Sequence, residues 1–160
     1  MIRNTAVTVC GPLNVNKLGV TYVHEHLMVK PQLPDEYYIP YTLDDEAAST
    51  EETRSFSAAG GETLVEMTPI NYGRNVKAYQ RIAQATGVHV ICCTGFHKQL
   101  FMPPWFGDKT DGELYDILMN EVTNGLDDTE IHPGVIKLGT SFEEVTAAEK
   151  RSIEAVARVH

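Results

Sequence analysis

The sequence predicts an α/β fold built on parallel strands. Short apolar runs with strand character alternate with amphipathic helical segments about four times along the 160 residues. This alternation is typical of α/β proteins, in which a helix connects each strand to a parallel neighbour. Residues 88–94 are apolar almost without interruption, which is the pattern of a parallel strand covered on both faces.

The expected strands are short and rich in apolar and β-branched residues. They lie at residues 5–9, 18–23, 62–67, 88–94 and 134–139. Gly11-Pro12 marks a turn between the first two, and the N-terminus is expected to form a short β-hairpin. Residues 30–47 and 96–109 contain several prolines and are predicted to be irregular.

Three helices are predicted from capping boxes, in which a Ser or Thr is followed three residues later by Glu. These boxes lie at residues 49–52, 110–113 and 146–149. The first helix is expected to end at Gly60-Gly61. A further helix is expected at residues 74–86, where apolar residues recur at helical spacing before Gly87.

Composition and charge exclude several classes of protein. Hydrophobic residues make up 42% of the chain, which excludes general disorder. The net charge is −9, so the surface repels nucleic acids and anionic membranes, and neither is an expected partner. No apolar stretch approaches the ~20 residues that span a bilayer. The N-terminus lacks the apolar core of a signal peptide, and the three cysteines form no Cys-x-x-Cys, so a cytoplasmic location is expected.

His24-Glu25-His26 follows the strand predicted at residues 18–23. Side chains alternate across a strand, so both imidazoles should leave it on one face, with Glu25 on the other. Two neighbouring imidazoles form half of a divalent metal site, one suited to zinc, iron, cobalt or nickel. A pair of ordinary histidines at a strand end is the alternative.

Lys137 stands among apolar neighbours in the last predicted strand. One interpretation is a lysine whose stem packs while its amine reaches solvent. The other is a desolvated amine with a lowered pKa, because burial disfavours the ammonium form. A neutral amine can add carbon dioxide and become a carbamate, which can bridge two metal ions that together polarise a substrate.

Every residue with this chemistry lies at or near the carboxyl end of a predicted strand. Such ends gather at the mouth of a (β/α)₈ barrel, where active sites lie. An open doubly wound sheet also binds ligands there, but it would usually show a Gly-rich phosphate loop, which this sequence lacks. His97 follows a strand end and is a candidate for substrate contact.

Six motifs in order resemble the phosphotriesterase-related family of the amidohydrolase superfamily. They are Cys-Gly-Pro-Leu (10–13), Leu-Gly-Val-Thr-Tyr-Val-His-Glu-His-Leu (18–27), Tyr-Gly-Arg-Asn (72–75), Thr-Gly-Phe (94–96), Gly-Leu-Asp-Asp-Thr (125–129) and Gly-Val-Ile-Lys-Leu-Gly-Thr (134–140). The resemblance runs from about residue 5 to residue 160, and it implies the N-terminal half of a (β/α)₈ TIM-type barrel. Residues 1–160 are then a single, incomplete metal-dependent hydrolase domain.

The resemblance also implies a site with two divalent metal ions, usually zinc. His24 and His26 match metal ligands, and Lys137 matches the carboxylated lysine that bridges both ions. Phe96, His97 and Trp105 are expected to line the substrate pocket. The implied reaction is hydrolysis of a small-molecule ester, lactone or phosphotriester, in which a metal-bridging hydroxide attacks the substrate.

The resemblance covers only about four of the barrel's eight strand–helix units. The family's two further histidine ligands and its aspartate ligand, which also takes the proton, have no counterpart here. The expected partners are therefore the missing C-terminal half or a second copy of the chain. The alternative function is a truncated, non-catalytic module that forms oligomers or binds a small molecule.

Overall fold

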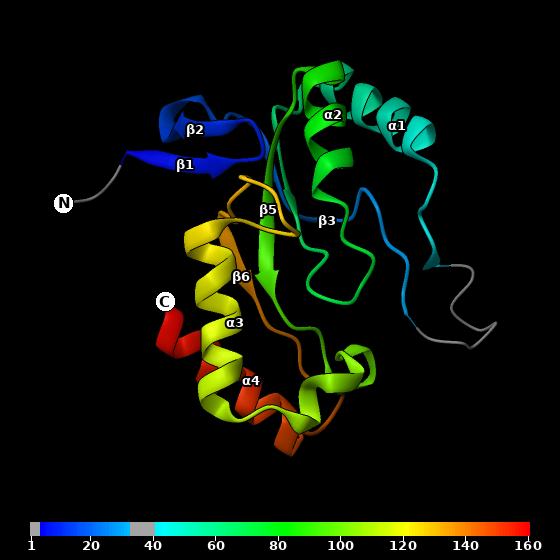
Figure 1. The fold of residues 1–160 in the computed structure, drawn as a ribbon. Helices are drawn as coiled ribbons and strands as arrows, with labels where there is room; N and C mark the ends of the chain where they lie inside the picture. The colour runs from blue at the N-terminus through cyan, green and yellow to red at the C-terminus, as the bar shows by residue number, and fades with distance from the viewer. Residues whose placement is uncertain (1–3, 33–40) are drawn as a thin grey trace.

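The computed structural model describes residues 4–32 and 41–160. Its centre is a parallel sheet of four strands in the order β3-β4-β5-β6 (Figure 1). The strands are β3 (Thr21–Glu25), β4 (Thr63–Glu66), β5 (His89–Gly95) and β6 (Val135–Lys137). A helix follows each one: α1 (Glu46–Ala58), α2 (Val76–Thr86), α3 (Asp111–Asn124) and α4 (Ala147–Val159). The predicted α/β order of strands and helices is thus confirmed.

The sheet is half of a barrel with two free edges. Within the described residues, β3 pairs only with β4, and β6 pairs only with β5. α1 packs beside α2, and α3 packs beside α4. Because the strands are parallel, their carboxyl ends lie at one end of the sheet, where the polar residues singled out in the sequence gather.

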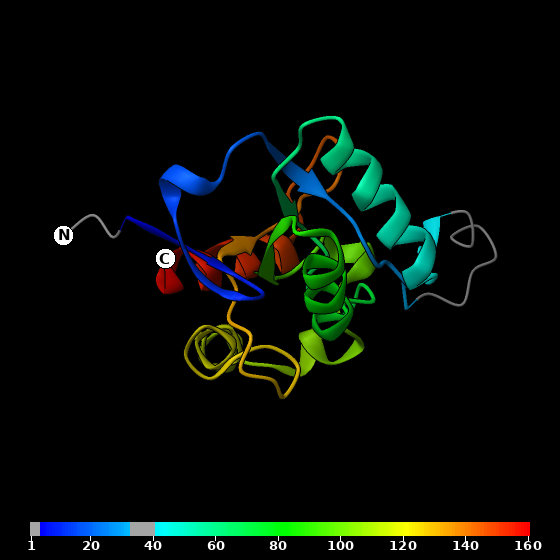
Figure 2. The same ribbon diagram turned by 90° about the horizontal axis from the view of Figure 1, so that it is seen from above.

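The N-terminal hairpin lies at the opposite end of the sheet from those polar residues. Strands β1 (Thr5–Thr8) and β2 (Gly11–Asn14) are antiparallel. The Val9 N–H donates to Val90 O (2.8 Å), which joins the hairpin to the amino end of β5. Figures 1 and 2 both show the hairpin on the side of the molecule away from α1.

The predicted turn and second strand were wrong in position, although the hairpin is confirmed. Gly11 and Pro12 lie inside β2, and the chain reverses at Val9-Cys10. The Thr8 hydroxyl donates to Gly11 O (2.7 Å) and accepts from Cys10 N–H (3.2 Å), so it closes this tight reversal. A 3₁₀ turn (η1, Val15–Lys17) then separates the hairpin from β3, which begins at Thr21 rather than at residue 18.

Two of the three predicted capping boxes are confirmed. Thr110 and Thr146 each accept a hydrogen bond from the backbone of a Glu three residues on, whose carboxylate accepts from the Thr backbone in return. The third was wrong, because the N-cap of α1 is Asp45, four residues before Ser49. The Ser49 hydroxyl instead donates to Leu27 O (2.6 Å) and ties α1 to the segment after β3.

Part of each predicted irregular segment has defined structure. In the segment 96–109 the chain forms two short 3₁₀ helices, η3 (Gln99–Phe101) and η4 (Pro104–Asp108). In the segment 30–47, residues 33–40 lie outside the described residues, and α1 begins at Glu46. No helix in the described part of the chain is long and apolar enough to span a membrane.

Candidate metal centre

The fold brings together three residues that are far apart in the sequence. His24 lies in β3, His26 follows it directly, and Lys137 is the last residue of β6. Lys137 Nζ lies 3.4 Å from His24 Nε2, and the ring centroids of His24 and His26 are 5.4 Å apart. The side chains at the two edges of the sheet therefore converge on its interior side.

Lys137 is buried, with 6% of its surface exposed. Its amine does not turn out to solvent, since it also donates to Met67 O (2.8 Å). Burial lowers the pKa of Lys137, against a weaker opposing effect of Cys93 and Glu66. A lowered pKa increases the fraction of neutral amine, which is the form that can react with carbon dioxide.

The two histidines are neutral at physiological pH. Burial is the main cause that lowers the pKa of His26 to about 4, and the charge of Lys137 lowers it further. The pKa of the more exposed His24 is also lowered, again first by burial and then by the charge of Lys137. Neutral imidazoles have a free lone pair, which a metal ligand requires.

Glu66, at the end of β4, and Thr68, just after it, are the polar partners of His26. The Thr68 hydroxyl contacts His26 Nδ1 (2.8 Å) and donates to Glu66 Oε1 (2.7 Å). Burial raises the pKa of Glu66 to about 7, despite the hydrogen bonds it accepts from Thr68. The sequence showed Glu66 near a strand end but gave neither residue a role, because an ordinary Glu-x-Thr spacing is no signal of one.

Aromatic rings connect His97 to the histidine pair. The His97 ring lies 4.8 Å from Tyr72 and 4.7 Å from Phe101 between centroids, and Tyr72 lies 6.1 Å from His26. His97 Nδ1 accepts from Lys98 N–H (2.7 Å), so the neutral ring has its proton on Nε2. Burial lowers the pKa of His97 to about 4, which keeps the ring neutral.

Phe96 and Trp105, the other two expected pocket residues, lie in the second apolar core cluster, which α3 and α4 help to form. Phe96 has no exposed surface and packs edge-on against Phe106, with 5.0 Å between centroids. Trp105 is half-buried and lies 6.2 Å from Phe96. Contact with substrate therefore stays a prediction for both, and for His97.

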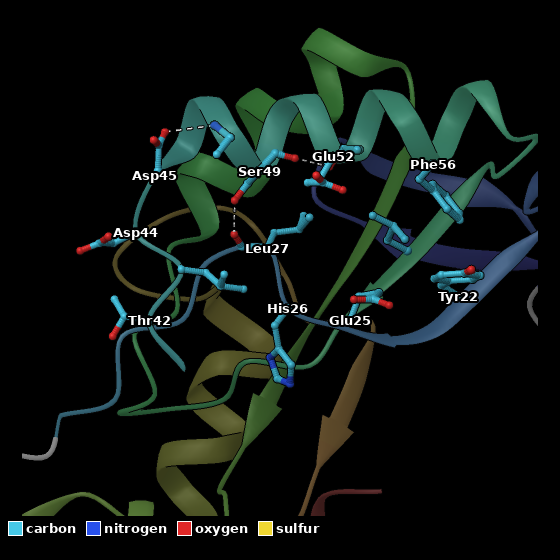
Figure 3. Close-up of a pocket in the computed structure, with 14 residues that line it drawn as sticks. Tyr22, Glu25, His26, Leu27, Thr42, Asp44, Asp45, Ser49, Glu52 and Phe56 are labelled. Carbon is cyan, nitrogen blue, oxygen red and sulfur yellow. Dashed lines mark hydrogen bonds between the residues drawn. The ribbon is translucent and has the colours of Figure 1, made fainter. Parts of the chain in front are cut away.

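A groove of about 420 Å³ lies between β3 and α1, beside the histidines. Figure 3 shows α1 forming one wall, with Ser49, Glu52 and Phe56, while the His26 ring is directed away from α1. Glu25 lines this groove. The groove thus lies on one side of the chain at His26, and the His24–Lys137 contact lies on the opposite side.

The donors present fit part of a metal site. Two neutral imidazoles and a buried amine suit a transition metal such as zinc. Within residues 4–32 and 41–160, however, no group of three or more His, Cys, Asp and Glu side chains is arranged to hold a metal ion. A complete coordination sphere needs further ligands from outside these residues.

Comparison with known proteins identifies the family. The model of the phosphotriesterase family matches residues 4–160, nearly the whole chain. The chain belongs to the phosphotriesterase family. The predicted resemblance is confirmed, and so is its extent, since the chain spans about half the length of the curated relatives it matches.

The relatives of this phosphotriesterase-family chain include hydrolases of known structure. It is 32% identical to a phosphotriesterase-related protein of Nematostella vectensis, covering 98% of this chain and 54% of that protein. It is 31% identical to a phospho-furanose lactonase of Mycoplasmopsis synoviae, over 99% of this chain and 49% of that protein. The crystal structure of a lactonase from Listeria monocytogenes superposes with a TM-score of 0.88 at 30% identity, over 98% of this chain and 53% of that one.

Proposed function

We propose that residues 1–160 form the N-terminal half of a metal-dependent hydrolase domain, which cleaves a small-molecule ester, lactone or phosphotriester once the barrel is complete. The approach of Lys137 Nζ to within 3.4 Å of His24 Nε2, from the opposite edge of the sheet, is the observation that supports this most strongly. A lactone is the first substrate class to test, because two of the relatives described above are lactonases.

His24 and His26 would hold a divalent metal ion, most simply zinc, through their ring nitrogens. Lys137 would serve as a bridging ligand between two ions after its neutral amine adds carbon dioxide. When bound, the ions would lower the pKa of a water molecule and polarise the substrate. His97, neutral and protonated on Nε2, would donate a hydrogen bond to a substrate oxygen from the wall it forms with Tyr72 and Phe101.

The free edges of the sheet indicate how the site would be completed. Val20 and Val23, beside and within β3, are 59% and 73% exposed, and Leu138 next to β6 is 42% exposed. Unpaired strands with exposed apolar residues readily pair with another chain. We propose that the missing C-terminal half of the barrel pairs with these edges and supplies the remaining metal ligands.

The histidine pair can be tested by zinc titration of the chain in the presence of bicarbonate. His24→Ala and His26→Ala should each weaken zinc binding by at least about tenfold, or ~1.4 kcal/mol, because each removes one of few ligands. The far-UV circular dichroism should not change, because strand ends at a barrel mouth serve function more than stability. His89→Ala, at the amino end of β5, is the matched control and should bind zinc normally.

A lactone and phosphotriester assay, with the C-terminal half of a family member supplied in trans, tests the hydrolase itself. Activity should appear with both halves together and be lost with His24→Ala. A wild-type chain that binds no zinc, cobalt or other divalent metal would contradict the metal centre.

Self-association is the second candidate, and the same free edges favour it. If β6 of each copy paired with β3 of the other copy, the two half-barrels would form a closed barrel without free edges. Light scattering after size-exclusion chromatography distinguishes the cases. A dimer inactive toward lactones and phosphotriesters would favour the non-catalytic function, and a monomer would exclude self-association.

A further inference from the structure

Glu66 is a buried carboxylate beside the histidine pair, with Oε1 3.7 Å from His26 Nδ1. It is 1% exposed at the end of β4, and only one of its two oxygens is used. Oε1 accepts hydrogen bonds from Thr68 N–H (2.8 Å) and from the Thr68 hydroxyl (2.7 Å). Oε2 forms no hydrogen bond of good geometry in the part of the chain that the structure describes.

An unpaired buried oxygen on a carboxylate is costly to stability. A leucine or methionine of similar size would fill the same space without this cost. The two hydrogen bonds that Oε1 accepts from Thr68 offset part of this cost, and they fix the position of the Thr68 hydroxyl.

The Thr68 hydroxyl has a single proton, which determines the direction of its contact with His26. A threonine hydroxyl can donate only one hydrogen bond, and here that bond goes to Glu66 Oε1. The same hydroxyl lies 2.8 Å from His26 Nδ1, so it must accept a proton from that nitrogen. This direction holds for the ionised carboxylate, which has only acceptors and no proton to donate to the Thr68 hydroxyl.

The structure assigns to Glu66 and Thr68 the role of positioning residues that hold His26 in the tautomer with its proton on Nδ1 and its lone pair on Nε2. This inference rests on the proposed metal centre and goes beyond it by naming the residues that orient one ligand. Partners of this kind fix both the tautomer and the ring orientation of a metal-binding histidine.

The test compares two variants by NMR without metal and by zinc titration. Long-range proton–nitrogen spectra report which ring nitrogen of His26 is protonated, with its signals assigned by their loss in His26→Gln. The wild-type chain should show protonated Nδ1. Thr68→Val should lose this preference and weaken zinc binding by 10- to 100-fold. Glu66→Leu should shift the proton to Nε2, because the freed Thr68 hydroxyl would then donate to Nδ1.

Two controls separate positioning from a general structural effect. Thr68→Ser keeps the hydroxyl and should keep both the tautomer and the zinc affinity. Thr53→Val removes another buried hydroxyl, which donates to Ser49 O (2.7 Å) within α1 rather than contacting a ring nitrogen of His26, and should change neither.

The inference is overturned if wild-type His26 is protonated on Nε2. It is also overturned if folded Thr68→Val and Glu66→Leu chains keep the wild-type tautomer. Because the NMR measurement needs no metal, a chain that binds no zinc would contradict the proposed function and still report on the tautomer.

Discussion

Replacing Lys137 with alanine should remove the response of metal binding to bicarbonate. In the wild-type chain, bicarbonate should strengthen zinc binding by supplying carbon dioxide to the buried amine, which lies 3.4 Å from His24 Nε2. Lys137→Ala should bind zinc at least about tenfold more weakly, or ~1.4 kcal/mol, at any bicarbonate concentration. Zinc titration with and without bicarbonate measures both effects.

The matched control is Lys98→Ala. Lys98 lies beside the same wall of the site, 5.6 Å from the centre of the Phe101 ring, and its loss should leave the bicarbonate response intact. A small carboxylic acid such as acetate should partly restore zinc binding to Lys137→Ala, because it can replace the missing carbamate. Full metal binding by Lys137→Ala without any added carboxylate would show that the carbamate proposal is wrong.

Replacing Arg74 with methionine should produce the largest loss of stability. The Arg74 side chain is 4% exposed, and it forms hydrogen-bonded ion pairs with Glu121 of α3 and with Asp127. It also donates to Cys93 O in β5 (3.3 Å). Methionine keeps the apolar stem but leaves Glu121 without its charge partner, and removing one member of such a pair costs about 3–5 kcal/mol.

Thermal denaturation measures this effect, and the expected decrease in Tm is roughly 10 °C for a chain of this size. The matched control is Arg81→Met. Arg81 is more than half exposed and pairs with Glu46, which is itself 36% exposed. Exposed pairs contribute about 0–1 kcal/mol, so this variant should melt close to the wild type. Equal decreases in Tm for the two variants would contradict the larger contribution to stability expected of the Arg74 ion pairs with Glu121 and Asp127.

The Arg74 cluster also shows what the sequence could not predict. Arg74 lies in the motif at residues 72–75 and Asp127 in the motif at 125–129, and both motifs were recognised only as resemblances. The structure shows that they contact each other directly. A single sequence does not reveal such long-range pairing, because residues 53 positions apart have no periodic relation.

Local signals predicted the fold well where a single interaction decides the structure. The Thr110 and Thr146 capping boxes and the glycine end of α2 are examples. The N-terminus of α1 was misplaced because Asp45 and Ser49 can both cap a helix, and the tertiary bond from Ser49 to Leu27 decided between them.

The candidate site was predicted by residue type and by position at strand ends. The approach of Lys137 to His24 agrees with that prediction. The burial of Phe96 could not be foreseen, because a residue just after a strand can point to the site or into the core. In this fold the Phe96 ring packs with Phe106 under the loop after β5.

β3 and β6 are separated by two strands, yet His24 and Lys137 meet. The sheet is therefore curled before any second half joins it. An ion bound by both side chains would link the two edge strands across the open side of the curled sheet. A ligand that binds only the native form at a hundred times its Kd adds about 2.7 kcal/mol to the unfolding free energy. Metal supply would thus govern how long an unpaired half-barrel stays folded.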